Sequence, residues 1–421
     1  MRRSAPLRAS TQPFEVIKLA EPNSSPPDYP MVRACPFDPP PDLAKLQREA
    51  PISRVRIWDG STPWLISRYD DARAVLSDPR VSSDIDKPGY PHVSAGIAAR
   101  PKESKVFVNM DGEEHAAQRL ALVADFTVKK MELLRPWIQS QVDGLIDAML
   151  AGPQPADLVE AFALPLPSIA ICEVLGVPYE DRDFFQGIGR TIISRDSTPE
   201  QSVKAFGEGF AYLGELVERK NAQPGDDVLS HLAVQQLQTG KLTGQQVTAM
   251  AVLLLVAGHG TTASMIALGT ALLLENPAQL RELRDSDDPA LVSSAVEELL
   301  RYLSIIHTGR RRVALEDLEV GGQVIKEGEG IVVAIDIANR DQDAIADPDR
   351  LDIHRGTRDH VAFGFGIHQC LGQSLARVEL QTAFGTLFRR IPTLAPALPV
   401  DELRFQHEGE VYGVDALPVR W

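Results

Sequence analysis

FGFGIHQCLG (residues 363–372) is the segment on which the fold assignment of this chain depends. A mostly apolar segment follows from Leu371 onward, so Cys370 lies where a glycine-rich loop meets a predicted helix. The start of a helix presents free N–H groups and partial positive charge, which stabilise a thiolate and lower the cysteine pKa. Gly364, Gly366 and Gly372 lack a Cβ, so the backbone can approach a flat partner closely. The segment therefore predicts a thiolate that faces a planar group.

Two simpler interpretations of Cys370 are a buried structural cysteine and a nucleophile activated by His368. The pattern FGxGxHxCxG, however, is matched at every fixed position. This loop resembles the haem-binding loop of the cytochrome P450 superfamily. The resemblance implies that Cys370 is the axial ligand of a haem b iron, which makes it the metal-binding residue, and that Phe363, Gly364 and Gly372 contact the cofactor.

A second motif, Glu298-Leu299-Leu300-Arg301, is similar to the ExxR signature of that family. Glu298 and Arg301 are three residues apart, so they share one face of a helix and can pair. Arg355, after DPDRLDIH, occupies the position where the family has a third partner, which would bind Glu298. Leu351 stands where the family usually has Phe. We interpret Glu298, Arg301 and Arg355 as structural residues.

Haem carries two propionates, which need cationic or N–H donors. His115 and Arg119 are four residues apart in EEHAAQR, so they share a helix face. By resemblance they are the HxxxR pair that binds the propionates, together with Arg312 in RRVALED and with His368. Any of these residues alone is compatible with a solvated surface charge, and it is the set that points to haem.

Residues 247–274 form a nearly continuous apolar segment, long enough to cross a bilayer. The central Gly258-His259-Gly260-Thr261-Thr262 step would be costly in lipid, which favours a buried central helix. Two glycines weaken the helix by about 1 kcal/mol each, so a kink is expected there; a packing notch for a neighbouring helix is the alternative. AGHGTT resembles the family pattern AGx(D/E)TT beside the oxygen site. Ala257 and Gly258 would then contact haem, and Gly260, Thr261 and Thr262 would be catalytic.

Gly260 departs from the pattern, because the family usually has Asp or Glu there to relay protons. General acid catalysis contributes roughly 100- to 10,000-fold, and glycine cannot supply it. Ordered water or a substrate hydroxyl could carry the protons, or the position could be altered, or the chemistry could need no oxygen activation. The nitric oxide reductase branch also has a small residue here. Lys102, Lys105 and Arg100 are the candidate basic residues for the nicotinamide nucleotide that it would use.

The composition favours a protein without nucleic-acid or membrane partners. The 421 residues carry a formal net charge of −15, and phosphate binding needs clustered Lys and Arg. Three separated cysteines make a poor disulfide framework, which indicates a reducing, cytoplasmic compartment. The N-terminal MRRSAPLRAS has no apolar core typical of a signal peptide.

The predicted fold class is mainly α with small β-sheets, an α+β arrangement that the resemblance makes a cytochrome P450 fold. Residues 1–35 are expected to be an extended or partly disordered arm, and residues 36–421 a single catalytic domain. ISRVRIWDGSTPWLISRY predicts a strand pair. Helices are expected over 128–150, 158–175 and 202–220, and strands near 318–333 and 403–421.

The resemblance covers the chain from about Pro36 to Trp421, and the ending VYGVDALPVRW is similar to soluble actinobacterial members. It implies a monomeric monooxygenase that hydroxylates or otherwise oxidises a small apolar or amphipathic molecule, such as a secondary metabolite. The electrons would come from a ferredoxin and its reductase. The substrate is expected against the loop of residues 82–106, the central helix, residues 305–308, and the turn near Val411 and Tyr412. The alternative is a nitric oxide reductase-like enzyme that takes electrons directly from NAD(P)H.

Overall fold

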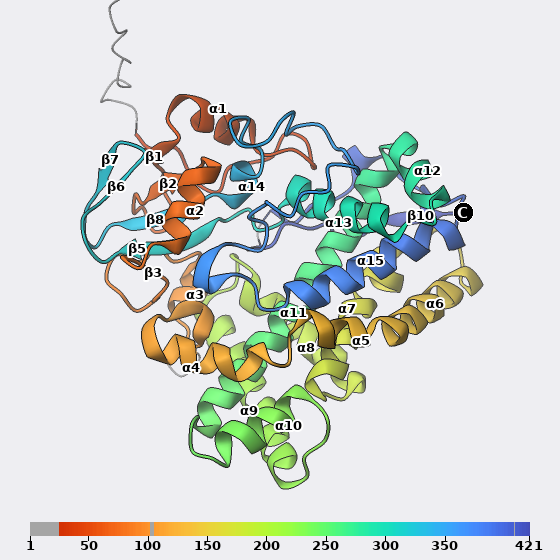
Figure 1. Ribbon diagram of the computed structural model, residues 1–421, viewed down its shortest axis with the longest axis horizontal. Coiled ribbons are helices and arrows are strands. Elements are labelled where there is room, and N and C mark those ends of the chain that lie inside the picture. The colour runs from red at the N-terminus through yellow and green to blue at the C-terminus, as the bar shows by residue number, and fades with distance from the viewer. Residues whose placement is uncertain (1–24, 102–104, 408) are drawn as a thin grey trace, which may run out of the picture.

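The strands of the largest sheet lie at one side of the molecule, and helices make up most of the rest (Figure 1). This computed structural model describes residues 25–101, 105–407 and 409–421. The α-helices are α1 Pro41–Glu49, α2 Tyr69–Ser77, α3 Ala95–Ala98, α4 Gly112–Val123, α5 Val128–Leu133, α6 Arg135–Ala151, α7 Pro165–Leu175, α8 Arg182–Ile193, α9 Pro199–Ala222, α10 Val228–Leu232, α11 Gly244–Leu274, α12 Pro277–Asp285, α13 Pro289–Leu303, α14 Ile335–Ala338 and α15 Gln373–Arg390.

Within the described residues, three sheets accompany the helices, with strand orders β1-β2-β8-β5-β3, β4-β10-β9 and β6-β7. Their strands are β1 Ile52–Arg54, β2 Trp64–Ile66, β3 Val81–Ser82, β4 Ala156–Asp157, β5 Arg310–Ala314, β6 Leu318–Val320, β7 Gln323–Ile325, β8 Gly330–Val333, β9 Ala395–Pro396 and β10 Pro418–Arg420. The expected strand pair is confirmed, because β1 and β2 are antiparallel with Ile52 opposite Ile66. The predicted class, mainly α with small sheets, is also confirmed.

Prolines decide where two of the predicted helices begin. The helix expected over 128–150 is divided into α5 and α6, and Pro136 lies in the first turn of α6. The segment expected as one helix over 158–175 begins with a π-helical turn, Val159–Ala163, before α7 starts at Pro165. Proline lacks the N–H that a helix interior needs, and it is well tolerated in the first turn, where that N–H has no intrahelical partner.

Helix α11 runs through the interior of the molecule (Figure 1). By length and composition it could cross a membrane, but it packs against α7, α8, α9, α13 and α15, and most of its apolar residues are buried. A helix that is apolar on all sides is typical of such a core position. The helix is assigned without interruption over all 31 residues, so the expected kink at residues 258–262 produces no break in it.

The predicted N-terminal arm is partly outside the described residues, since they begin at residue 25. From there the chain packs on the strand pair: the Tyr29 N–H donates to the Arg56 carbonyl over 2.8 Å, and Tyr29 is only 4% exposed. Residues 25–35 therefore hold buried contacts with the folded part of the chain. Near the other end, strand β10 and a bridge between Phe405 and Val414 match the strands expected over 403–421.

Candidate active site

The loop that carries Cys370 is held by backbone hydrogen bonds and by glycines in the left-handed region. The Cys370 N–H donates to the Phe363 carbonyl over 2.9 Å, and φ is +72° at Gly364 and +74° at Gly366. A Cβ on Gly366 would lie 2.6 Å from the Leu76 carbonyl oxygen, so this glycine permits packing against α2. A Cβ on Gly364 or Gly372 would meet no atom closer than 3.9 Å. These two positions keep the open space that a planar cofactor needs.

Cys370 lines a cavity of about 450 Å³ between this loop and α11. Burial raises the pKa of its thiol, and the opposing influences are Arg310, the Gly372 N–H, Arg119 and Arg377. The expectation of a lowered pKa is therefore wrong for the chain without cofactor. The physical reason is that α15 begins only at Gln373, and burial outweighs the nearby donors and cations. An iron ion at the sulfur would supply the missing positive charge.

One face of α11 forms the opposite wall of the cavity. Its lining residues from this helix include Ala257, Gly258, Gly260, Thr261 and Thr262. The Thr261 hydroxyl donates to the Ala257 carbonyl over 2.9 Å. A Cβ on Gly260 would meet no heavy atom within 4 Å, so the place of the usual acid is open space.

Gly258 and His259 also face neighbouring helices. A Cβ on Gly258 would lie 2.5 Å from Ile171 Cγ1 of α7, so Gly258 is a packing notch as well as part of the cavity wall. His259 is buried, and its Nδ1 lies 2.8 Å from the Leu255 carbonyl. A Cβ on Gly189 of α8 would come within 3.0 Å of the His259 ring. His259 is thus packed against α8 and is not placed to replace the missing acid.

Two of the four expected propionate donors, His115 and His368, carry unsatisfied polar atoms. The His115 and His368 rings lie 4.3 Å apart between centroids, and His115 Nε2 and His368 Nδ1 are buried without a hydrogen-bond partner among the described residues. Burial lowers the pKa of His115 to about 4 and that of Arg312 to about 10. Arg119 and Arg312 line the cavity together with His368, whereas His115 lies behind His368. Buried polar atoms normally have partners, so these residues fit an anionic cofactor such as haem.

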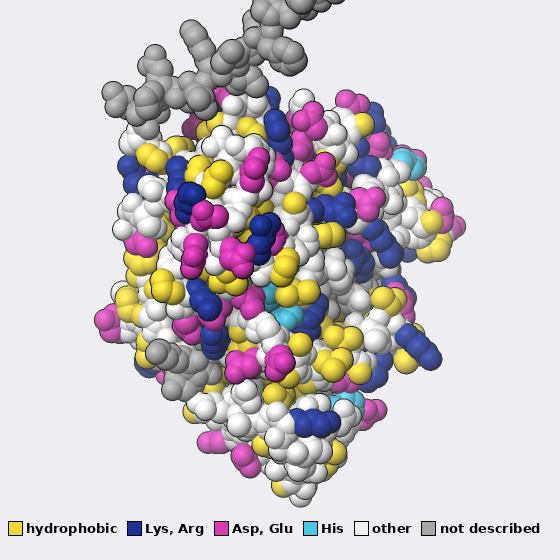
Figure 2. Space-filling model, turned by 60° about the vertical axis from the view of Figure 1, so that its left-hand side comes forward, with side chains coloured by type: hydrophobic (Ala, Val, Ile, Leu, Met, Phe, Trp, Pro, Cys, Tyr) yellow, Lys and Arg dark blue, Asp and Glu magenta, His cyan; other side chains and the backbone are white. Residues whose placement is uncertain are grey.

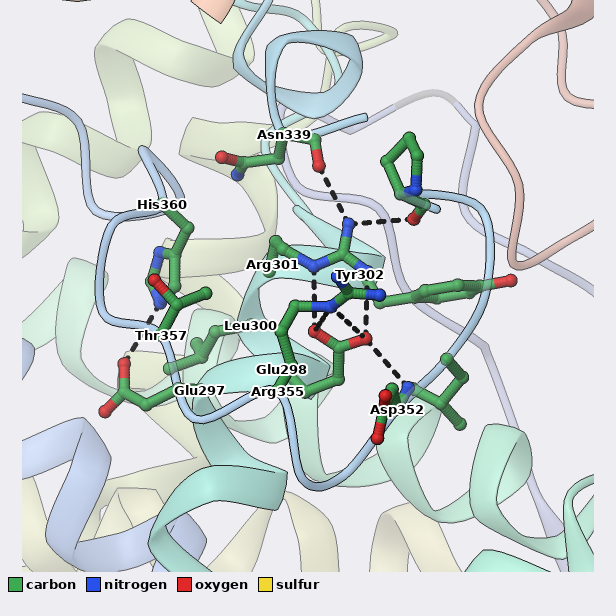
Figure 3. A network of polar contacts seen from close by, with 12 residues as sticks. Glu297, Glu298, Leu300, Arg301, Tyr302, Asn339, Asp352, Arg355, Thr357 and His360 are labelled. Carbon is green, nitrogen blue, oxygen red and sulfur yellow. Dashed lines mark hydrogen bonds and ion pairs between the residues drawn. The ribbon is translucent and has the colours of Figure 1, made fainter. Parts of the chain in front are cut away.

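Glu298, Arg301 and Arg355 form the buried network shown in Figure 3. Arg301 Nε and Nη2 lie 2.8 and 2.9 Å from the two carboxylate oxygens of Glu298, and both side chains are 0% exposed. Arg355 Nε lies 3.1 Å from Glu298 Oε2. Arg301 also donates to the carbonyls of Asn339 and Pro348, and Arg355 to that of Ala346. The network joins α13 to the segment that leads to the Cys370 loop.

The adjacent Glu297 belongs to a second network that the sequence did not predict. Its carboxylate accepts from Arg377 Nε over 2.6 Å and lies 3.0 Å from His360 Nε2. Burial raises the pKa of Glu297, but the hydrogen bonds from His360 and Arg377 outweigh it, and the pKa falls to about 2. Arg377 also lies over the ring of Phe363, 4.7 Å from its centroid. Glu297 thereby supports the aromatic residue at the start of the Cys370 loop.

Two further polar residues of the cavity were not predicted from the sequence. Arg310 lines the cavity and lowers the pKa of Cys370, and its position two residues before Arg312 on β5 is the signal that could have identified it. Glu379 also lines the cavity, and burial raises the pKa of its carboxyl well above the usual value. The only feature of the sequence that could have identified Glu379 is that it is an acidic residue within the apolar helix after Cys370.

The expected substrate contacts mostly line the same cavity. From residues 82–106 the lining includes Ile85, Tyr90, Val93, Ile97 and Val106, and residues 102–104 lie outside the described part of the chain. Ile306 and Val411 complete this part of the wall. The turn near Val411 and Tyr412 thus contributes Val411 to the lining, whereas the Tyr412 ring packs beside Phe405 and His307.

Comparison with known proteins places this geometry in a family. The family model for cytochrome P450 matches residues 193–396. The chain is 52% identical over 410 residues to cytochrome P450 GfsF of Streptomyces halstedii, covering 96% of this chain and 99% of that protein. It is 47% identical over 399 residues to pentalenic acid synthase of Streptomyces avermitilis, covering 94% and 98%.

A solved structure agrees with this assignment. The mycinamicin VIII C21 methyl hydroxylase MycCI of Micromonospora griseorubida superposes with a TM-score of 0.88 at 39% identity, over 94% of this chain and all of that one. The chain therefore belongs to the cytochrome P450 family, and the protein is a cytochrome P450 oxidoreductase with a haem-thiolate site.

Proposed function

We propose that the protein is a haem-thiolate monooxygenase that hydroxylates or otherwise oxidises a small apolar or amphipathic secondary metabolite, with residues 36–421 as one catalytic domain. The observation that carries this proposal is Cys370 facing Thr261 across a largely apolar cavity of about 450 Å³. Relatives whose names refer to mycinamicin hydroxylation and to pentalenic acid synthesis support a substrate of this kind.

The proposed cofactor is haem b, held by Cys370 at the iron and by His115, Arg119, Arg312 and His368 at the propionates. When bound, haem supplies the iron at which oxygen is activated, with electron density from the thiolate. The chain supplies the geometry and the electrostatics. Among these contributions, α11 forms part of the cavity wall, and the unpartnered Nδ1 of His368, which lines the cavity, would gain an acceptor.

Proton supply is the step in which this chain differs from its family. Thr261 holds its hydroxyl on the Ala257 carbonyl, so the hydroxyl oxygen is free to accept a hydrogen bond from water or substrate. Gly260 lines the cavity, and a Cβ there would meet no heavy atom within 4 Å, so a water molecule or a substrate hydroxyl has room to approach this position. We propose that such a group relays the protons, with Thr261 and Thr262 fixing its place.

We further propose that a ferredoxin and its reductase supply the electrons, and that the protein is a cytoplasmic monomer without nucleic-acid or membrane partners. Ile367, inside the Cys370 loop, is 60% exposed, and Leu120, beside the loop-binding Arg119, is 74% exposed. These exposed apolar side chains flank the Cys370 loop, where an electron donor would have to approach the haem. Figure 2 shows acidic and basic side chains interspersed over one face, which offers no broad basic area for nucleic acid.

The alternative function, nitric oxide reduction with electrons taken directly from NAD(P)H, is favoured by one observation, the small residue at 260. The basic residues suggested for the nucleotide argue against it. Arg100 lies 3.3 Å from Asp86, and Lys105 lies 2.7 Å from Asp84, so both cations have acidic partners. Lys102 lies outside the described residues. Addition of NO and NADH without ferredoxin tests this alternative, and formation of nitrous oxide would support it.

A reduced CO-difference spectrum of the wild type and of Cys370→Ala tests the main proposal. We expect the Soret band of a thiolate-ligated haem in the wild type and its loss in Cys370→Ala. His368→Ala is the matched control, because it removes a neighbouring donor but leaves the ligand, so the band position should be kept. A wild type without the thiolate band would refute the proposal.

A further inference from the structure

A buried guanidinium lines the cavity where β5 approaches residues 409–411. Arg311 belongs to the cavity wall and is only 5% exposed. Its side chain makes no hydrogen bond or ion pair with any described residue, and its Nε and Nη1 are both sealed without a partner. A buried charge without hydrogen bonds or a counter-ion is strongly unfavourable, so this position requires an explanation.

The nearest acids do not neutralise Arg311. Glu410 also lines the cavity and acts on Arg311 through space, but the two side chains form no ion pair within 4 Å. The buried Asp336 lies 3.9 Å from another buried guanidinium, that of Arg33. The Tyr29 ring lies under Arg311, 5.6 Å from its guanidinium carbon, and the Tyr29 hydroxyl donates to the His307 carbonyl. The described surroundings thus leave Arg311 with donors and no strong acceptor.

The rest of the cavity is apolar on the side of the expected substrate. Ile85, Val93 and Ile97 line it before α4, and Val252 and Val256 line it from α11. Arginine presents a rigid fork of donors that matches a carboxylate, and such pairs are stronger than neutral hydrogen bonds. A molecule with an apolar body and one carboxylate would satisfy both parts of the wall.

We propose that Arg311 is a specificity-determining residue that binds a carboxylate of the substrate, whose apolar body lies along α11. The inference rests on the proposed monooxygenase function and restricts its substrate to amphipathic acids. Arg310 and Arg312, the neighbours of Arg311 on β5, act on Cys370 and serve the expected propionate site respectively.

Isothermal titration calorimetry with two matched pairs of probes tests the proposal without requiring turnover. The pairs are dodecanoic acid with dodecan-1-ol, and lithocholic acid with its methyl ester, at pH 7.5 where the acids are ionised. We expect the wild type to bind the acid of at least one pair about tenfold or more tightly than its neutral partner. Arg311→Met should abolish this preference while binding of the neutral probe changes less than about twofold.

Two further variants keep the test decisive. Arg54→Met removes an arginine from β1 of the same sheet, where it pairs with Glu329 outside the cavity, and should retain the preference for acids. Glu410→Gln keeps Arg311 and removes the closest competing charge, so it should tighten binding of the acids only. Glu410→Gln also tests the role of Arg311 if Arg311→Met does not fold.

Equal binding of acid and neutral partner by the wild type in both pairs, or an unchanged preference in Arg311→Met, would overturn the proposal. The reduced CO-difference spectrum of each preparation separates this result from a failure of the proposed function. A normal thiolate band without acid preference refutes only the role of Arg311. A missing band in the wild type refutes the monooxygenase assignment, whatever the calorimetry shows.

Discussion

Two alanine substitutions two positions apart in α11 should have different effects on stability. A Cβ on Gly260 meets open space, whereas a Cβ on Gly258 would lie 2.5 Å from Ile171 Cγ1. Gly260→Ala should therefore stabilise the protein by about 1 kcal/mol, the difference in helix propensity between the two residues. Gly258→Ala gains the same propensity but overpacks the contact with α7, which costs about 1–3 kcal/mol. Gly258→Ala should thus be less stable than Gly260→Ala by about 1–3 kcal/mol.

Thermal unfolding followed by circular dichroism measures this difference. At about 2.1 cal/mol/K per residue, a chain of 421 residues has an unfolding entropy of about 0.9 kcal/mol/K, so 1 kcal/mol moves Tm by about 1 °C. We expect Tm to rise by about 1 °C in Gly260→Ala and to lie about 1–3 °C lower in Gly258→Ala than in Gly260→Ala. Ile171→Val in the Gly258→Ala background should recover part of the loss. Equal shifts in both alanine variants would refute the argument that the two glycines have different roles.

Three further predictions concern the networks and the open position on α11. Glu298→Gln leaves the fully buried Arg301 without its counter-charge and should lower the free energy of unfolding by about 3–5 kcal/mol in a urea titration. As a control, Glu49→Gln breaks the exposed pair of Glu49 with Lys45 and should lower it by under about 1 kcal/mol. The pKa of Glu297 is lowered to about 2, so its contribution to the free energy of unfolding is complete above about pH 4.5 and is lost as the pH falls toward 2. Glu297→Gln should therefore make stability less dependent on pH in this acid range, and an unchanged dependence would contradict this. Gly260→Glu places a carboxyl group at a position that lines the cavity and should increase the ratio of product formed to electrons consumed, and an unchanged ratio would show that proton supply does not limit coupling.

Local motifs carried most of the site prediction. The ligand could be identified because ten contiguous residues, FGFGIHQCLG, set the glycine conformations and the cysteine in one loop. Glu298 and Arg301 could be paired because residues three apart share a helix face, and the ion pair is present. The strand pair at β1 and β2 was likewise encoded by alternation on either side of a turn.

Interpretations that depended on the direction of a side chain or on burial could not be made from the sequence. The pattern AGHGTT does not say which residue faces which neighbour, and only packing shows Gly258 against α7, His259 against α8 and Gly260 beside the cavity. The pKa of Cys370 is raised because burial, a tertiary property, outweighs the donors nearby.

The sequence by itself therefore determined the family, the proposed ligand and the ion pair within α13, because each depends on residues close together in the chain. The tertiary structure decided which side chains line the cavity and which partners they meet. Arg355 reaches Glu298 across 57 positions, and Arg311 becomes a buried cation only when β5 packs beside residues 409–411. Periodicity limits which residues share a face, but the choice of the face that meets the cavity belongs to long-range packing.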